Sequence, residues 1–356
     1  MKRCLTVFSF FILILATATA QDHPIESQIF DEITQLEFSD SGQPVVFTQD
    51  GDHLVHILNQ NSFEPEIQLV PKGQGPGELQ TQHASFLDKK NNRVFMIGPD
   101  KRMIGYNFSR KLIYDALIED LSLGLMNQKN PTMLIKDKYL FISSSPPLMA
   151  SEKPDEPIPF IQMIDTTTTK VVYEFTMSLD QLAFESYDVV EKANQVILHP
   201  ELVMINDRLS VLVINGLPYF YFFVNGEFVK RTEIDADFEV EYITSTREEF
   251  GDNVGVRTPS NINSVQLIGN DHLLLSYGNI HQEIPVGFSV HRIEHSVQSG
   301  LNDEITITKI KDQTLTGFED LSELNLTYHK GDLFIHNNYD WLAHQIYVIE
   351  DLSLGF

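Results

Sequence analysis

The feature that most constrains this chain is a strand–turn–strand unit that recurs six times. In each unit a short apolar strand and a polar turn lead into a second, more strongly apolar strand. The second strands begin near Val45, Val94, Tyr139, Leu209, Leu273 and Leu333. The intervals between them are 49, 45, 70, 64 and 60 residues. A recurring unit, even at a loose period such as this, is typical of folds built from one repeated supersecondary element.

The first strands and the turns complete this pattern. The expected first strands are Ile33–Ser39, Ala84–Asp88, Thr132–Lys136, Glu201–Asn206, Ser264–Gly269 and Leu324–His329. Asp50-Gly51, Asn225-Gly226 and Gly331-Asp332 lie between apolar runs, as hairpin turns do. Outer strands are expected at Tyr219–Val224 with Glu227–Ile234, and at Gly287–Ile293 with Glu304–Ile310. Six antiparallel units of about four strands predict an all-β fold, a six-bladed β-propeller with four-stranded antiparallel blades.

The ends of the repeat predict how the ring closes. The last unit has a third strand at Gln345–Ile349 but only a weak fourth, and Ile25–Phe30 is able to supply it. Closure by this N-terminal strand hides sheet edges that otherwise invite aggregation. Two stretches depart from the pattern. The segment 143–159 holds five prolines and predicts a surface loop, and 178–198 predicts an insert with a short helix. The role of both inserts is left open.

The first twenty residues have the layout of a secretory signal peptide. Lys2 and Arg3 precede an apolar run from Leu5 to Leu15, and small residues at 18–20 suit a cleavage site. The run is shorter than the roughly 20 residues that span a bilayer. We therefore expect a signal peptide at 1–20, a single propeller domain at 21–356, no transmembrane segment after cleavage, and a periplasmic or secreted location. The remaining 336 residues give 56 to each of six units.

Charge and cysteine usage exclude several function classes. The chain has 25 Lys and Arg against 50 Asp and Glu, a net charge of -25, which becomes -27 after removal of the signal peptide. Nucleic-acid binding draws its affinity from clustered Lys and Arg, so no nucleic-acid partner is expected. The single cysteine, Cys4, leaves with the signal peptide, which excludes disulfides, thiolate metal sites and cysteine nucleophiles in the mature protein. We expect an acidic monomer.

The strongest local motif is the run Lys72 to Leu79, of sequence KGQGPGEL. It lies between an expected outer strand, Glu66–Val70, and the next inner strand. Pro76 and Gly77 suit the two central positions of a type II turn. The run resembles the Gly-x-Gly-Pro-Gly-Glu-Phe linker of NHL-repeat propellers and of the bacterial six-bladed TolB-like propellers, with Leu79 where Phe is usual. The resemblance covers 66–114 and implies the fold more than an activity.

The linker also supplies the residues predicted for binding. Gly73, Gly75, Pro76, Gly77 and Glu78 form this binding-loop candidate. Turn geometry accounts for the glycines and the proline. Glu78 either caps backbone amides inside the loop or faces the channel mouth and contacts a ligand or cation.

Twelve histidines make metal sites worth testing. His53 and His56 lie three apart, on opposite faces of a strand. His291 and His295 share a face, but exposed outer-strand histidines are the simpler interpretation. His329 and His336 flank the Gly331 hairpin. Asp50-Gly51-Asp52 lacks the remaining ligand positions of a calcium loop. No metal site and no catalytic residue is predicted from these patterns, and no cofactor is expected.

The favoured function is therefore binding of a protein, peptide or glycan partner by an exported propeller. The alternative is a metal-dependent lactonase, hydrolase or lyase with calcium in an axial channel site. Such a site takes one residue from each of several inner strands, and the candidates are Glu78, Asp88, Glu201, Asn206, Asn263 and Asn325. A third interpretation, a scaffold without a small ligand, predicts an exposed apolar patch. Sequence alone leaves the ligand and any catalytic activity undecided.

Overall fold

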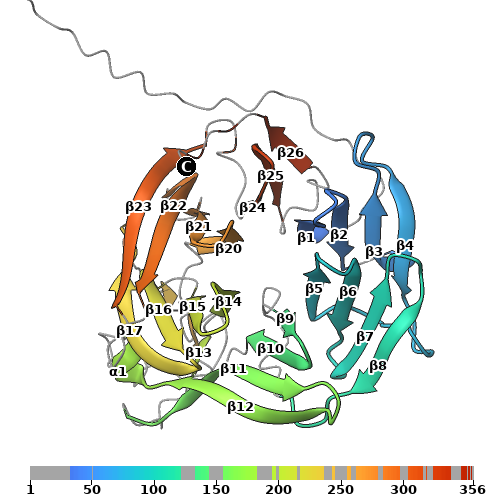
Figure 1. Cartoon of the computed structure of the whole chain (residues 1–356), viewed down its shortest axis with the longest axis horizontal. Helices are drawn as coiled ribbons and strands as arrows, with labels where there is room; N and C mark the ends of the chain where they lie inside the picture. The colour runs from blue at the N-terminus through green and yellow to red at the C-terminus, as the bar shows by residue number, and fades with distance from the viewer. Residues whose placement is uncertain are drawn as a thin grey trace, which may run out of the picture.

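The computed structural model of the chain describes a ring of antiparallel β-sheets (Figure 1). The described residues are 33–49, 51–121, 133–143, 155–182, 195–197, 200–214, 217–235, 243–244, 255–257, 262–279, 284–296, 304–315, 318, 324–337, 346–350, 352 and 354.

The first three blades each contain four strands, ordered from the axis to the rim as they occur in the chain. Blade one is β1 (Ile33–Phe38), β2 (Pro44–Thr48), β3 (His53–Leu58) and β4 (Pro65–Pro71). Blade two is β5 (Ala84–Asp88), β6 (Arg93–Ile97), β7 (Arg102–Asn107) and β8 (Leu112–Leu117). Blade three is β9 (Met133–Lys136), β10 (Tyr139–Ser143), β11 (Ile158–Asp165) and β12 (Lys170–Met177).

The other three blades follow the same order. Blade four is β14 (Pro200–Met204), β15 (Leu209–Ile214), β16 (Tyr219–Val224) and β17 (Glu227–Glu233). Blade five is β20 (Ile262–Ile268), β21 (His272–Asn279), β22 (Ile284–Ser296) and β23 (Glu304–Thr314). Blade six is described as β24 (Leu324–His329), β25 (Asp332–Asn337) and β26 (Ile346–Ile349). The six-bladed propeller with four-stranded antiparallel blades is thus confirmed.

The turns explain why the strands pair in this register. Asn225 and Gly226 have φ values of 51° and 87°, so both central residues of this hairpin adopt the left-handed conformation that a type I′ turn needs. In blade six the left-handed residues are Lys330 and Gly331, one position earlier than predicted. Asp332 instead opens β25 and pairs with His329.

The core is divided into six apolar clusters, and each cluster fills the interface between two neighbouring blades. Second strands such as β2 and β15 are buried along their whole length, because both of their faces contact a blade. Between blades three and four, for example, Phe160 and Phe175 pack with Tyr221 and Phe223. Burial on both faces accounts for the nearly continuous apolar runs in the sequence.

Blade six closes the ring directly onto blade one. Phe334 and Ile346 pack in one cluster with Leu36 and Phe38, and the Thr327 hydroxyl donates a hydrogen bond of 2.8 Å to the Leu36 carbonyl. The third strand expected at Gln345–Ile349 is confirmed as β26. The expected closing strand, Ile25–Phe30, lies outside the described residues, so closure by an N-terminal strand stays a prediction.

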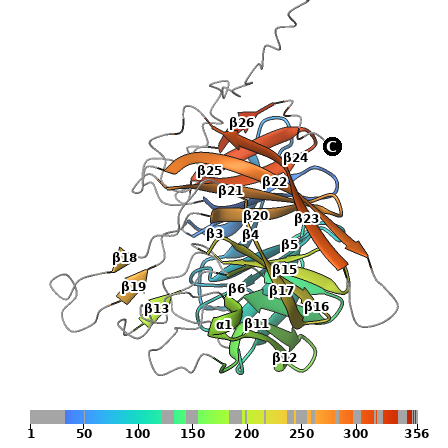
Figure 2. The same ribbon diagram turned by 90° about the vertical axis from the view of Figure 1, so that its left-hand side faces the viewer.

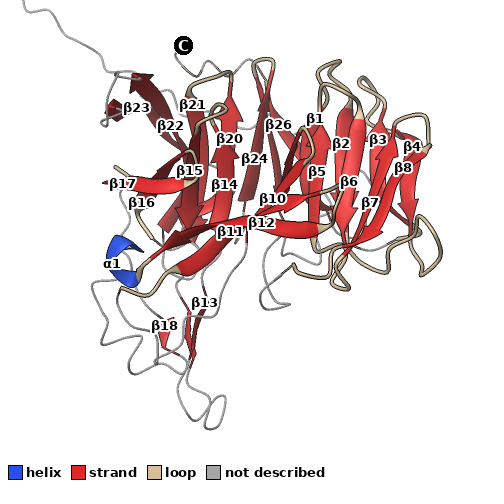
Figure 3. Ribbon diagram, turned by 60° about the horizontal axis from the view of Figure 1, so that its bottom comes forward, coloured by secondary structure: helices blue, strands red, loops and turns tan. Residues whose placement is uncertain are grey.

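A small additional sheet projects from the ring (Figures 2 and 3). It consists of β13 (Gln195–Ile197), β19 (Gly255–Arg257) and β18 (Ile243–Thr244), and β13 runs parallel to β19. These segments immediately precede blades four and five, so the sheet joins two inserts that the sequence did not connect. The expected helix is the single turn α1 (Leu179–Leu182), where Ser178 and Gln181 form reciprocal capping bonds.

Two other findings complete the description. The predicted loop at 143–159 ends earlier than expected, because β11 begins at Ile158. None of the helices formed by the described residues is long and apolar enough to cross a bilayer.

Candidate functional site: the axial cavity

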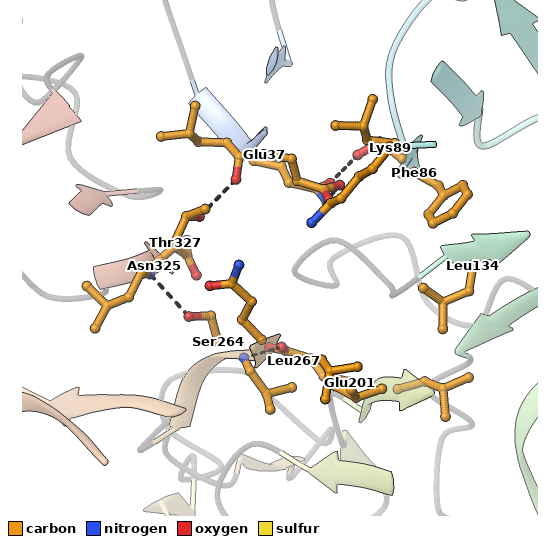
Figure 4. Close-up of a pocket in the computed structure, with 18 of the residues that line it drawn as sticks. Glu37, Phe86, Lys89, Leu134, Glu201, Ser264, Leu267, Asn325 and Thr327 are labelled. Carbon is orange, nitrogen blue, oxygen red and sulfur yellow. Dashed lines mark hydrogen bonds and ion pairs between the residues drawn. The ribbon is translucent and has the colours of Figure 1, made fainter. Parts of the chain in front are cut away.

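A cavity of about 540 Å³ lies on the axis of the ring (Figure 4). The first strand of every blade contributes to its wall. Representative lining residues, one from each of these strands, are Glu37, Phe86, Leu134, Glu201, Ser264 and Asn325. Ligand pockets usually have volumes of about 300–1,000 Å³ and mix apolar walls with a few placed polar groups. The axial cavity has this size and this character.

Side chains of one inner strand hydrogen-bond the backbone of the next. Glu201 accepts a hydrogen bond of 2.9 Å from the Val265 amide. Ser264 accepts one of 3.2 Å from the Leu326 amide, and Gln266 bonds both the amide and the carbonyl of Tyr328. Since 264 faces 326 and 266 faces 328, β20 and β24 run in the same direction. These bonds occupy backbone groups that an inner strand otherwise leaves unpaired at the axis.

The wall differs from one side to the other. Phe86 and Leu134 lie on one side in Figure 4, and Thr327, Asn325 and Ser264 lie on the opposite side. Phe86 and Leu134 are only partly buried, so their apolar surface faces the cavity. A ligand here meets an apolar side and a polar side.

Three of the carboxylates in the wall are already engaged. Glu37 forms an ion pair of 3.1 Å with Lys89. Asp88 accepts two hydrogen bonds from Arg93. It also accepts three from Asn91, two at Oδ1 and one at Oδ2. Glu201 holds the Val265 amide. The charges of Glu37 and Asp88 are therefore balanced by a neighbouring cation, and the Glu201 carboxylate is hydrogen-bonded within the wall.

One end of the cavity is different, and we call Asn263, Asn325 and His336 the amide–imidazole end. Asn325 opens β24 and pairs directly with His336 on β25, which places their side chains on the same face. The offset of 62 residues that aligns β20 with β24 sets Asn263 level with Asn325. Asn263 is also the extra residue of a β-bulge in β20. Bulges redirect side chains and are frequent beside binding sites.

Buried polar groups at this end lack partners. His336 is 2% exposed and Asn263 is 4% exposed. The Asn263 amide donates to the Gly278 carbonyl at 3.2 Å, but its Oδ1 has no hydrogen-bond partner among the described residues. Burial lowers the pKa of His336 to about 4, and a hydrogen bond to the Thr34 backbone offsets this in part. The second ring nitrogen of His336 has no partner among the described residues. The imidazole is therefore neutral near pH 7, with one donor and one acceptor.

The six inner-strand candidates divide between the cavity and other places. Asp88, Glu201, Asn263 and Asn325 line the cavity, as the sequence predicted for inner-strand ends. Asn206 instead caps the β14–β15 turn by accepting from the Arg208 and Leu209 amides. Glu78 is not among the residues that line this cavity.

The linker loop, residues 72–79, is held together by its own contacts. Glu78 Oε2 accepts a hydrogen bond of 2.8 Å from the Gly75 amide, and the Glu78 amide donates to the Gly75 carbonyl at 3.1 Å. Gly77 has a φ of 76°, as the expected turn requires.

Blade two clamps this loop from outside. Asp115 accepts a hydrogen bond of 3.0 Å from the Gly77 amide and two of 2.7 Å from Arg102. Arg102 also donates to the Gly75 carbonyl at 3.0 Å, and the Tyr106 hydroxyl donates to the Gly77 carbonyl. Arg102 holds the pKa of Asp115 below its usual range. A binding role for the five loop residues stays a prediction beside this architecture.

The histidine pairs do not come together as metal ligands. His56 directs Nε2 to the His53 carbonyl at 3.0 Å. His329 and His336 lie at opposite ends of the β24–β25 hairpin, since His329 pairs with Asp332 and His336 with Asn325. Contrary to the expected exposure, His291 is 2% exposed, because β22 packs it against Phe220 of blade four. Across the described residues, no three His, Cys, Asp or Glu side chains are grouped so that they are able to hold a metal ion.

Exposed large apolar side chains occur on outer strands of several blades rather than on one face. Those with the greatest exposure among the described residues are Leu117, Val172 and Val229, on β8, β12 and β17.

Sequence reasoning missed His336 as a lining residue. It tested this histidine only as a metal partner of His329, by their closeness to one turn. Its position in the hairpin could have identified it, because His336 is a polar residue on an otherwise apolar second strand and lies directly across from Asn325.

Comparison with solved structures supports the fold. A putative exported protein from Bacteroides fragilis aligns with a TM-score of 0.51 at 10% identity, over 94% of this chain and 93% of that one. A member of the DUF4221 family from Bacteroides vulgatus gives 0.51 at 9% identity, over 93% and 96%. The β-propeller domain of Cps50 (Swd1) from Myceliophteria thermophila gives 0.50 at 10% identity, over 92% and 88%. No family model matches the chain, and no curated protein matches its sequence. The class defined by the fold is therefore the six-bladed β-propeller.

Proposed function

We propose that this protein is an exported six-bladed propeller that binds a protein, peptide or glycan partner in its axial cavity. The observation that carries the proposal is the 540 Å³ cavity to which all six inner strands contribute. Its mixture of apolar surface and placed hydrogen-bonding groups is what ligand pockets provide. WD40 repeats and a putative exported protein among the structural neighbours support an interaction module.

The proposal includes the type of propeller, which is the NHL-repeat or TolB-like type. The linker at 72–79 connects β4 to β5 where the NHL-repeat and TolB-like resemblance places it. Export is proposed from the N-terminal pattern of residues 1–20. N-terminal sequencing of the protein secreted by a bacterial host is expected to begin at Gln21, and an uncleaved chain starting at Met1 contradicts export by this signal.

The binding proposal is tested with a variant that fills the cavity. Leu134 is partly buried in the wall, so Leu134→Trp is expected to occupy part of the cavity and to weaken ligand binding at least tenfold. Leu117→Trp makes the same change on the outer strand β8, where the side chain is 48% exposed, and is expected to bind like the wild type. The probes are an immobilised panel of oligosaccharides and peptides, followed by calorimetric titration of those retained. Absence of any retained probe, or equal binding by both variants, contradicts the proposal.

The alternative activity, a calcium-dependent lactonase, hydrolase or lyase, keeps support only from the inner-strand position of Asp88, Glu201, Asn263 and Asn325. The described donors do not fit calcium, because Asp88 is bonded to Arg93 and Glu201 to the Val265 amide. Metal analysis of the purified protein, together with thermal melting with calcium and with chelator, decides the matter. A bound stoichiometric metal, or a melting temperature raised by calcium, favours the enzyme.

A further inference from the structure

The amide–imidazole end combines two features that a purely structural wall does not need. It lines the axial cavity, and it holds buried hydrogen-bond acceptors without partners in the described chain. A buried polar group without a partner destabilises the folded state, typically by about 1–3 kcal/mol. Groups retained in this condition commonly serve a ligand or an ordered water.

The charge of this end favours a neutral ligand. His336 is uncharged near pH 7 because burial lowers its pKa to about 4, and Asn263 and Asn325 carry no charge. An anion finds no cation among these three groups and is also repelled by a chain of net charge -25. A cation finds the nearby Glu201 already holding the Val265 amide.

The inner strands disfavour an extended peptide here. Peptides that bind a sheet edge do so through main-chain hydrogen bonds. At this side of the cavity the Val265, Leu326 and Tyr328 amides already receive side chains from a neighbouring strand. The Leu36 carbonyl is likewise occupied by Thr327. Recognition is left to side chains that offer both donors and acceptors.

We propose that the amide–imidazole end binds a neutral, hydroxyl-bearing ligand of the saccharide class. Each hydroxyl is able to donate, which matches the two unpartnered acceptors, the second ring nitrogen of the neutral His336 and the Oδ1 of Asn263. The apolar C–H face of a sugar ring suits the partly buried Phe86 and Leu134 on the other side of the cavity. This inference rests on the proposed function, since it specifies the ligand class of the same cavity.

The test compares two equally buried histidines, of which only one lines the cavity. His336 and His291 are each 2% exposed, and burial lowers the pKa of both to about 4. His291, however, bonds the Ser289 hydroxyl at 2.9 Å and is not among the residues lining the cavity. His336→Leu and Asn263→Leu are the test variants, and His291→Leu is the matched control. All three are first checked for cooperative thermal unfolding.

The probes are neutral oligosaccharides, uronic-acid oligosaccharides and unmodified peptides on the same array, with calorimetric titration of those retained. The expected result is selective retention of neutral oligosaccharides, weakened at least tenfold by His336→Leu or Asn263→Leu and unchanged by His291→Leu. If His336→Leu fails to fold, Asn263→Leu carries the test. Selective retention of peptides or of uronic acids overturns the inference.

The same data separate this inference from the proposed function. Binding that is lost in Leu134→Trp but unchanged in His336→Leu and Asn263→Leu overturns the inference and keeps the cavity as a binding site. Binding that is unchanged in Leu134→Trp overturns both.

Discussion

The linker loop and the amide–imidazole end differ in whether their polar side chains have hydrogen-bond partners within the protein. In the loop, Glu78, Asp115 and Arg102 bond the backbone of the loop or one another. At the amide–imidazole end, His336 and Asn263 are buried, and one ring nitrogen and one amide oxygen have no partner in the described chain. The conspicuous motif is thus explained by its own stability, whereas the inconspicuous residues leave hydrogen-bonding capacity for another molecule. Predictions that separate stability from binding test this difference.

Acidification is expected to produce the largest effect, and it acts through three buried histidines before it reaches the loop. Burial lowers the pKa of His56, His291 and His336 to about 4 from 6.5. The unfolded chain therefore takes up these protons first, and stability falls as the pH drops from 6.5 towards 4. Between pH 7.5 and pH 5 we expect a loss of roughly 2 kcal/mol for each histidine, measured by urea unfolding.

The loop responds in a different pH range. Since Arg102 lowers the pKa of Asp115 below 3.8, the stability from this carboxylate is present above pH 3.8 and is lost as the pH falls through the lower folded value. A free energy of unfolding that does not change between pH 7.5 and pH 5 contradicts the buried, neutral state of the histidines.

Removal of the clamp on the loop is expected to be the next largest effect. Asp115→Ala leaves Arg102 and the Gly77 amide without their shared acceptor. We expect a loss of about 2–3 kcal/mol in the free energy of unfolding, because hydrogen bonds to charged groups are the strong ones. Ligand binding in the cavity is expected to stay unchanged.

The control for this change is an exposed ion pair. Asp207, 89% exposed and paired with Lys136, is expected to tolerate Ala within about 0.5 kcal/mol. Equal effects of Asp115→Ala and Asp207→Ala show that the loop is not held by its clamp.

A smaller loss in the free energy of unfolding is expected from a substitution inside the linker loop. A Cβ added at Gly73 clashes with a carboxylate oxygen of Glu78, so Gly73→Ala forces that flexible side chain away from the Gly75 amide. The expected cost is about 1–2 kcal/mol. In Glu78→Ala the space is free, so adding Gly73→Ala to it is expected to cost less than in the wild type. Additive costs in this double-mutant cycle, measured by urea unfolding, contradict the contact.

The fold was predictable because its signals are local and repeated. The observed first strands begin within two residues of the expected ones, and the second strands within one. Apolar runs and turn dipeptides determine these elements without reference to distant parts of the chain. The parallel pairing of β13 with β19 was not predictable, because it joins segments about sixty residues apart that are only three residues long.

The cavity was predictable in part. Asp88, Glu201, Asn263 and Asn325 were expected from the periodicity of inner strands, and all four line the cavity. That Asp88 is engaged by Arg93 and that His336 keeps a ring nitrogen without a partner depends on contacts between strands, which spacing in the sequence does not encode. The buried position of His291 was missed for the same reason, since Phe220 on the neighbouring blade covers it.

The most direct measurement is the sign of the stability change in His336→Leu compared with His291→Leu, by urea unfolding at pH 7.5 without ligand. Replacing a buried imidazole that keeps one ring nitrogen without a partner by an apolar side chain is expected to raise the free energy of unfolding by about 1–2 kcal/mol. Replacing the imidazole of His291, which bonds Ser289, is expected to lower it by a similar amount, about 1–2 kcal/mol. Opposite signs support a cavity wall that keeps hydrogen-bonding capacity for a ligand. A loss of stability in both variants contradicts it.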